Sequence, residues 1–102
     1  MAQLQKGKTV AYRSSGWSLW PRVRSNDLCL YQPIHLDAPV SVDDIVFCHV
    51  FPSGFFYAHL VSHKEWASEE HRYKYWISNM KGWCNGYTYL THIYGKLYSV
   101  LR

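Results

Sequence analysis

The sequence has no uninterrupted apolar stretch of about 18 residues, the minimum for a membrane-spanning helix, so no membrane span is expected. Residues 1–13 are polar and basic and lack the hydrophobic region of a secretory signal peptide, which predicts an intracellular, soluble protein. The three cysteines are an odd count without paired spacing. A disulfide framework is therefore not expected, and a reducing compartment is favoured.

Charged residues are also few. They make up 18% of the chain, below the ~25% of an average domain, and the net charge of +4 is not concentrated in one block. This balance allows nucleic-acid binding but gives little support for it. The six histidines and three cysteines lack the clustered spacing of a zinc site, so neither a metal nor another cofactor is expected.

Aromatic residues, by contrast, are abundant: they make up 18% of the 102 residues and include nine tyrosines and five tryptophans. A chain of this length forms one domain, expected here over residues 1–102 with a basic N-terminal segment at 1–13. So many rings exceed what one small core encloses. We therefore expect several to be half-exposed, with their polar tips in water.

Strand signals dominate the chain, and helix signals are scarce. Only residues 64–72 have a helix-forming composition, enough for at most two turns. Runs of β-branched and aromatic residues between turn residues predict strands at 27–31, 45–51, 55–61, 73–79, 87–90 and 93–101. The expected fold class is all-β, a small coiled sheet or partly open barrel of short antiparallel strands.

A hairpin is expected around the Pro-Ser-Gly turn at 52–54. A three-residue loop at this point predicts that Phe47 lies opposite His59 on the adjoining strand. Because side chains alternate along a strand, His59 is expected to share its face with Tyr57 and to be held rigidly.

Several short motifs with residue types found in catalytic sites follow one another along the chain. Residues 16–21 (GWSLWP) have the form G-x-S-[LM]-x-P, and residues 27–30 (DLCL) have the form D-[LI]-x-[LV]. The others are 43–47 (DDIVF), 57–61 (YAHLV), 81–85 (KGWCN) and 94–97 (YGKL).

In this order the motifs resemble the serine peptidase superfamily of signal peptidases and LexA-type self-cleaving repressors, over residues 14–101. The resemblance implies a fold of that kind, with Ser18 as nucleophile and His59 as general base, as in the His-type signal peptidases. Such a histidine accepts the proton of the serine hydroxyl and returns it to the leaving amine. The backbone near Ser18 is expected to bind the oxyanion, and the hydroxyl of Ser14 or Ser15 is an alternative hydrogen-bond donor to it.

In the His-type peptidases an acid orients the histidine, whereas this sequence has Trp83 at that position. We take Asp44 as the candidate that supports His59, and a role in a turn is its alternative. Three further candidates are Asp27, Asp37 and Asp43.

The cysteines and the tryptophans near Ser18 carry expectations of their own. Cys29 and Cys48 lie in expected strands and are predicted to be buried, small hydrophobic residues. Cys84 lies in a loop with two glycines and is the candidate for a reactive thiol. Most aromatic residues are expected to pack the sheet, but Trp17 and Trp20 flank Ser18, where a substrate would lie.

Two functional hypotheses follow. In the first, the chain is a soluble Ser/His endopeptidase acting on an extended peptide along a strand edge, which Trp17, Trp20 and Tyr57 contact. In the second, it is a non-catalytic module that binds a peptide, a protein partner or a single-stranded nucleic acid through its aromatic, basic surface. Hydrogen-bond reach between Ser18 and His59 favours the first hypothesis, and a large separation favours the second.

Overall fold

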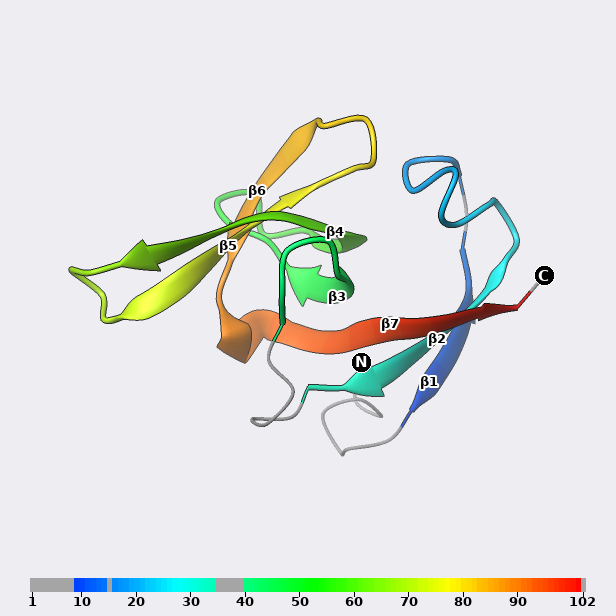
Figure 1. The fold of residues 1–102 in the computed structure, drawn as a ribbon, viewed down its shortest axis with the longest axis horizontal. Coiled ribbons are helices and arrows are strands. Elements are labelled where there is room, and N and C mark those ends of the chain that lie inside the picture. The colour runs from blue at the N-terminus through cyan, green and yellow to red at the C-terminus, as the bar shows by residue number, and fades with distance from the viewer. Residues whose placement is uncertain (1–8, 15, 35–39, 102) are drawn as a thin grey trace.

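The computed structural model describes residues 9–14, 16–34 and 40–101, which form one antiparallel sheet of seven strands that curls into a half-barrel (Figure 1). The strand order is β1-β2-β7-β3-β4-β5-β6. The strands are β1 (Val10–Arg13), β2 (Leu28–Pro33), β3 (Ile45–His49), β4 (Phe56–Ala67), β5 (Arg72–Ser78), β6 (Cys84–Thr88) and β7 (Ile93–Leu101), and a short 3-10 turn, η1, spans Leu90–His92. The expected all-β class is confirmed.

The core consists of two clusters of buried side chains. One is formed mainly from β3, β4 and β5 and comprises Val40, Val46, Cys48, Val50, Val61, Tyr75, Ile77 and Ile93. The other packs the β1–β2 loop onto β2 and β3 and comprises Leu19, Val23, Cys29, Tyr31 and Ile45. The predicted burial of Cys29 and Cys48 is confirmed, and both thiols are free.

The β3–β4 hairpin has a different register from the expected one. Val46, not Phe47, pairs with His59, and Phe47 pairs with Ala58. The reason is a longer turn: Gly54 has a φ of +79° and donates its N–H to the Val50 carbonyl at 2.8 Å. Gly reaches this positive φ without the steric cost that a side chain brings, so the turn has one more residue than predicted.

The segment 64–72 forms no helix, despite its composition. Strand β4 continues to Ala67, a turn covers 68–71, and β5 starts at Arg72. Trp66 packs edge-on against Tyr73 with ring centroids 5.0 Å apart, and the Lys64 ammonium lies 4.5 Å from the Tyr73 centroid. These cross-strand contacts stabilise a hairpin that outweighs local helix propensity.

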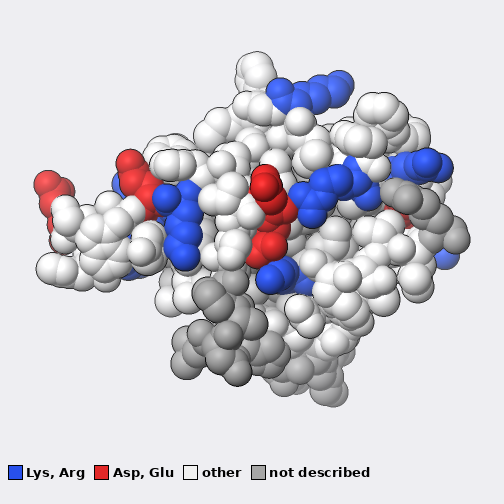
Figure 2. Space-filling model, viewed as in Figure 1, with Lys and Arg blue, Asp and Glu red and all other residues white. Residues whose placement is uncertain are grey.

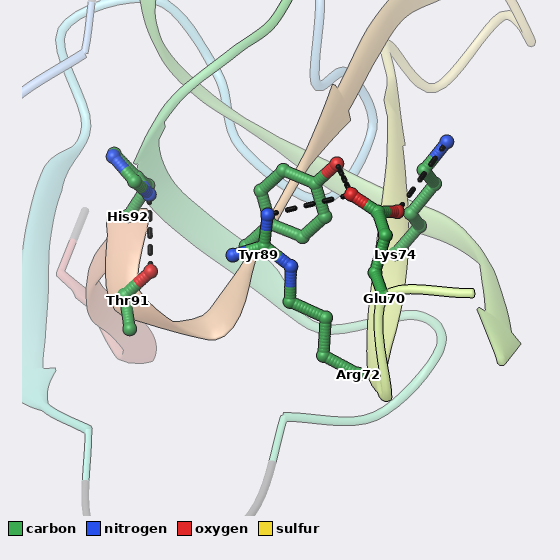
Figure 3. Close-up of polar contacts among 6 residues, drawn as sticks. All are labelled: Glu70, Arg72, Lys74, Tyr89, Thr91 and His92. Atoms are coloured by element: carbon green, nitrogen blue, oxygen red, sulfur yellow. Dashed lines mark hydrogen bonds and ion pairs between the residues drawn. The ribbon is translucent and has the colours of Figure 1, made fainter. Parts of the chain in front are cut away.

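A polar network lies at the turn end of this hairpin (Figure 3). The Tyr89 hydroxyl donates to Glu70 at 2.9 Å, and Arg72 and Lys74 lie 3.4 Å and 3.9 Å from the same carboxylate. The Arg72 guanidinium also lies 3.4 Å from the centroid of the Tyr89 ring. The hydrogen bond from Tyr89, followed by the basic neighbours, lowers the pKa of Glu70.

Two strand boundaries also differ from the expected ones. Strand β1 lies within the segment expected only to be basic, and it pairs with β2 from Val10↔Tyr31 to Arg13↔Leu28. Strand β6 begins at Cys84, earlier than the strand expected at 87–90. Within the described residues, no helix has the length and apolarity needed to cross a membrane.

Candidate active site

Ser18 lies in a tight turn of the loop between β1 and β2. Gly16, with a φ of +77°, precedes the turn, and the Val23 amide donates to the Leu19 carbonyl at 3.0 Å. The side chains of Leu19 and Val23 are buried in the second core cluster, so they anchor the turn to the sheet. The Ser18 carbonyl accepts a hydrogen bond of 2.8 Å from the Met80 amide, which ties the turn to the β5–β6 loop at the same end of the molecule (Figure 1).

His59 faces this turn from the N-terminal part of β4. Its Nε2 lies 3.0 Å from the Ser18 Oγ, although the two residues are 41 positions apart. The Tyr57 ring stacks on the imidazole, with centroids 4.9 Å apart and planes at 24°. The expected shared face of Tyr57 and His59 is therefore present, and the structure brings the two predicted catalytic residues into contact.

Asn85 completes the arrangement. Its Oδ1 lies 2.6 Å from the Nδ1 of His59. The register of β6 explains how it reaches the imidazole: Ile77 pairs with Gly86 and Ser78 pairs with Cys84, so Asn85 is the extra residue of a β-bulge. A bulge turns a side chain out of the regular alternation of a strand, and bulges are common beside active sites.

The protonation state of His59 follows from these partners. An amide oxygen only accepts hydrogen bonds, so the Nδ1 of His59 carries a proton and donates it to Asn85. The Nε2 lone pair then accepts the hydrogen bond from the Ser18 hydroxyl. Burial lowers the pKa of His59, and the hydrogen bond to Asn85 opposes this shift in part. The lowered pKa favours the neutral imidazole, which is the form able to accept a proton.

The orienting side chain is not where the resemblance places it. Trp83, at the expected position of the acid, is 72% exposed, and Asn85 two residues later contacts His59. The side chain of Asn79 shapes the intervening loop, because its Oδ1 accepts from the amides of Lys81 and Trp83 at 2.9 Å and 3.0 Å. Sequence reasoning included Asn85 in a motif but assigned it no role.

Asp44 is engaged elsewhere and does not orient His59. Its carboxylate accepts from the Ser41 amide at 2.8 Å and lies 3.3 Å from the Lys96 ammonium. These contacts match the alternative role of Asp44 in a turn. Asp27 likewise accepts from the backbone amide of Arg24, at 2.8 Å.

The other residues named as candidates from the sequence are Ser14, Ser15, Asp37 and Asp43. Ser15 and Asp37 lie outside the described residues. Ser14 donates its hydroxyl to the Arg24 carbonyl at 2.6 Å. Asp43 has a φ of +77°, and its carbonyl accepts from Arg22 at 2.6 Å.

A cleft of about 130 Å³ opens beside the Ser18–His59 contact. Its walls come from β1 and the following loop on one side and from β4 on the other, and they include Tyr12, Ser14, Leu19, Tyr57 and Ala58. Tyr57, one of the three expected substrate-contact residues, therefore lines this cleft. Trp17 and Trp20 flank Ser18 in the chain and are 57% and 54% exposed.

The sequence raised two further questions, a metal site and a reactive thiol at Cys84. The part of the chain that the structure describes contains no group of three or more His, Cys, Asp or Glu side chains able to hold a metal ion. Cys84 is exposed, and its Sγ lies 3.7 Å from the Gly86 carbonyl oxygen.

Comparison of the chain with protein-family models, curated proteins and solved structures gave no match. An assignment of function therefore depends on the geometry of Ser18, His59 and Asn85. These side chains form a continuous hydrogen-bonded series from a hydroxyl through an imidazole to an amide oxygen. Such a series can activate a serine hydroxyl for nucleophilic attack.

Proposed function

We propose that the chain is a serine peptidase that cleaves an extended peptide, with Ser18 as nucleophile, His59 as general base and Asn85 as the residue that orients His59. The observation that carries the proposal is the pair of contacts at His59, 3.0 Å to Ser18 and 2.6 Å to Asn85. The same constellation of nucleophile, base and orienting group recurs on unrelated folds, including versions with an asparagine.

The proposed reaction proceeds in two halves. The Ser18 Oγ forms a bond to the peptide carbonyl carbon, while its proton moves to the Nε2 of His59. When the resulting tetrahedral intermediate collapses, the C–N bond breaks and His59 gives the proton to the leaving amine. Water then attacks the acyl-enzyme with the help of His59, and Ser18 recovers its proton as the acid leaves.

Oxyanion stabilisation is proposed for the backbone amides of residues 16–18. The positive φ of Gly16 turns the chain sharply just before the nucleophile. Backbone N–H groups of such a turn are fixed donors that need no rearrangement during the reaction. The Met80–Ser18 hydrogen bond keeps this turn in place from the opposite loop.

The position of the cleft favours an extended peptide as substrate. Strand β1 is one edge of the sheet, and its residue Tyr12, with Ser14 just beyond it, lines the cleft that also contains Ser18 and His59. A peptide added to an exposed edge gains main-chain hydrogen bonds, and its alternate side chains enter adjacent pockets. The exposed indoles of Trp17 and Trp20 offer further contact surface beside the scissile bond.

The motif resemblance supports the same proposal, with one departure. In this resemblance, Ser18 and His59 correspond to the nucleophile and the base of the signal-peptidase and LexA-type superfamily. The orienting group is the amide of Asn85 where the His-type members carry an acid, so His59 receives orientation without an adjacent negative charge.

The alternative of a non-catalytic binding module has weaker support. The 3.0 Å contact between Ser18 and His59 is the geometry expected for the enzyme. Lys and Arg side chains are scattered and interleaved with acidic ones over the face in Figure 2, rather than gathered into a stripe that would follow a nucleic-acid backbone.

A serine-reactive phosphonate probe tests the proposal. Wild-type protein should be labelled, and Ser18→Ala should not. Ser62→Ala is the matched control, because Ser62 is an exposed serine on β4 that hydrogen-bonds the Trp76 carbonyl away from the cleft. Equal labelling of wild type and Ser18→Ala, or no labelling of either, contradicts the proposal.

A further inference from the structure

Asn85 and Gly86 form an Asn-Gly pair directly against the imidazole of His59. In such a pair the backbone nitrogen of glycine can attack the asparagine side-chain carbonyl, because glycine has no Cβ to obstruct the approach. Asparagine is accordingly counted among the thermolabile residues. The question is whether this fold slows the reaction or promotes it.

Packing imposes a glycine after Asn85. A Cβ at Gly86 would lie 2.2 Å from the Phe51 carbonyl oxygen and 2.9 Å from the Val50 Cγ1, and the φ of Gly86 is +133°. No larger residue is accommodated there without moving the main chain. The glycine that follows Asn85 is thus a consequence of how β6 passes the β3–β4 turn.

The position of Asn85 favours reaction in two ways. As the bulge residue of β6, Asn85 has no partner in the β5–β6 pairing that would fix it in a regular ladder. Its Oδ1 accepts a hydrogen bond of 2.6 Å from the Nδ1–H of His59. That donor polarises the Cγ=O bond and stabilises the negative charge that develops on Oδ1 when a nucleophile adds to Cγ.

We propose that Asn85–Gly86 is a self-modification site, at which His59 promotes conversion of the Asn85 amide to a carboxylate. The Gly86 nitrogen forms a bond to Cγ, the Cγ–Nδ2 bond breaks, and ammonia leaves with the former Gly86 amide proton. Water then adds to Cγ of the cyclic imide, the Cγ–N bond breaks, and the Gly86 nitrogen regains a proton. Water is the only co-reactant, and the polarised Cγ directs opening toward aspartate.

The consequence for activity rests on the proposed function. A carboxylate at position 85 changes the Ser18–His59–Asn85 series into a serine–histidine–aspartate series, which stabilises the imidazolium formed during catalysis. The newly made chain is then the less active form, and activity increases as Asn85 is converted. The conversion itself requires no peptidase activity.

The proposal is tested by incubating the folded chain in water labelled with heavy oxygen and then mapping its peptides by mass spectrometry. Asn85 should gain the mass of an acid with one heavy oxygen, at least about tenfold faster than Asn79 and Asn26 in the same sample. These two are internal controls, because they precede Met80 and Asp27 rather than glycine. Conversion of Asn85 no faster than that of Asn79 overturns the proposal.

Variants of the two partners separate this proposal from the peptidase. His59→Ala, or the larger His59→Leu if the first does not fold, should slow conversion at least about tenfold, whereas Ser18→Ala should leave it unchanged. Undiminished conversion without the imidazole overturns the role of His59. Probe labelling of Ser18 without conversion of Asn85 refutes only the self-modification, and conversion without labelling refutes only the peptidase.

Discussion

The amide of Met80 donates a hydrogen bond of 2.8 Å to the carbonyl of Ser18, joining the turn that carries this proposed nucleophile to the loop that leads to Asn85. The two loops lie far apart in the sequence but meet at one end of the sheet (Figure 1). His59 lies on β4, with one ring nitrogen toward Ser18 and the other toward Asn85 at the start of β6. The geometry of the site therefore depends on the β5–β6 loop as well as on Ser18.

Asn79→Ala is expected to weaken the site indirectly. Its Oδ1 accepts from the amides of Lys81 and Trp83, so the substitution leaves two backbone donors of the β5–β6 loop without this partner. We expect a loss of about 1–2 kcal/mol in the free energy of unfolding, measured in urea, together with slower phosphonate labelling of Ser18. The control is Glu69→Ala in the exposed 68–71 turn, and equal effects of both variants would contradict this role of the loop.

Asn85→Asp is expected to raise the pKa of His59, because a negative charge beside the imidazole favours its protonated form. The acid limb of the labelling rate against pH should therefore move to higher pH than in wild type. Asn85→Ala removes the orienting acceptor and should reduce labelling at neutral pH at least about tenfold. An acid limb that is identical in Asn85→Asp and wild type would show that position 85 does not act on the base.

Folding stability is expected to decrease at acidic pH through His59. Burial lowers its pKa in the folded protein below the ordinary value of 6.5, so the unfolded chain binds the proton first as pH decreases. The stabilising contribution of neutral His59 is therefore complete above pH 6.5 and is lost as pH falls toward the lower folded-state pKa. Urea unfolding across this range should show a steeper loss in wild type than in His59→Leu, and parallel curves would contradict the expectation.

Two glycines of the same region provide a matched pair for stability. Gly86→Ala introduces a Cβ 2.2 Å from the Phe51 carbonyl oxygen and should cost at least about 3 kcal/mol of unfolding free energy. Gly82→Ala, at a φ of +90° with open space around it, should cost only about 1–2 kcal/mol from backbone strain. Equal losses in the two variants would show that the close approach at Gly86 is not a constraint.

Sequence reasoning found the all-β class and the pair Ser18 and His59, because strand composition and the order of short motifs are local signals. It missed Asn85, because the bulge that aims this residue at His59 depends on the register between β5 and β6. The register that it predicted between β3 and β4 was wrong by one residue, because the turn through Gly54 is longer than its Pro-Ser-Gly sequence suggests. Sequence reasoning also indicated a helix at 64–72, because composition does not reveal the cross-strand contacts, such as that between Trp66 and Tyr73, that stabilise a hairpin there.

The central claim is that His59 activates Ser18, and the rate of phosphonate attachment tests it most directly. Mass spectrometry of the labelled protein should place the adduct on Ser18, and the attachment rate in His59→Ala or His59→Leu should fall at least about a hundredfold below that of wild type. An adduct on another residue, or an attachment rate that does not depend on His59, would contradict the account.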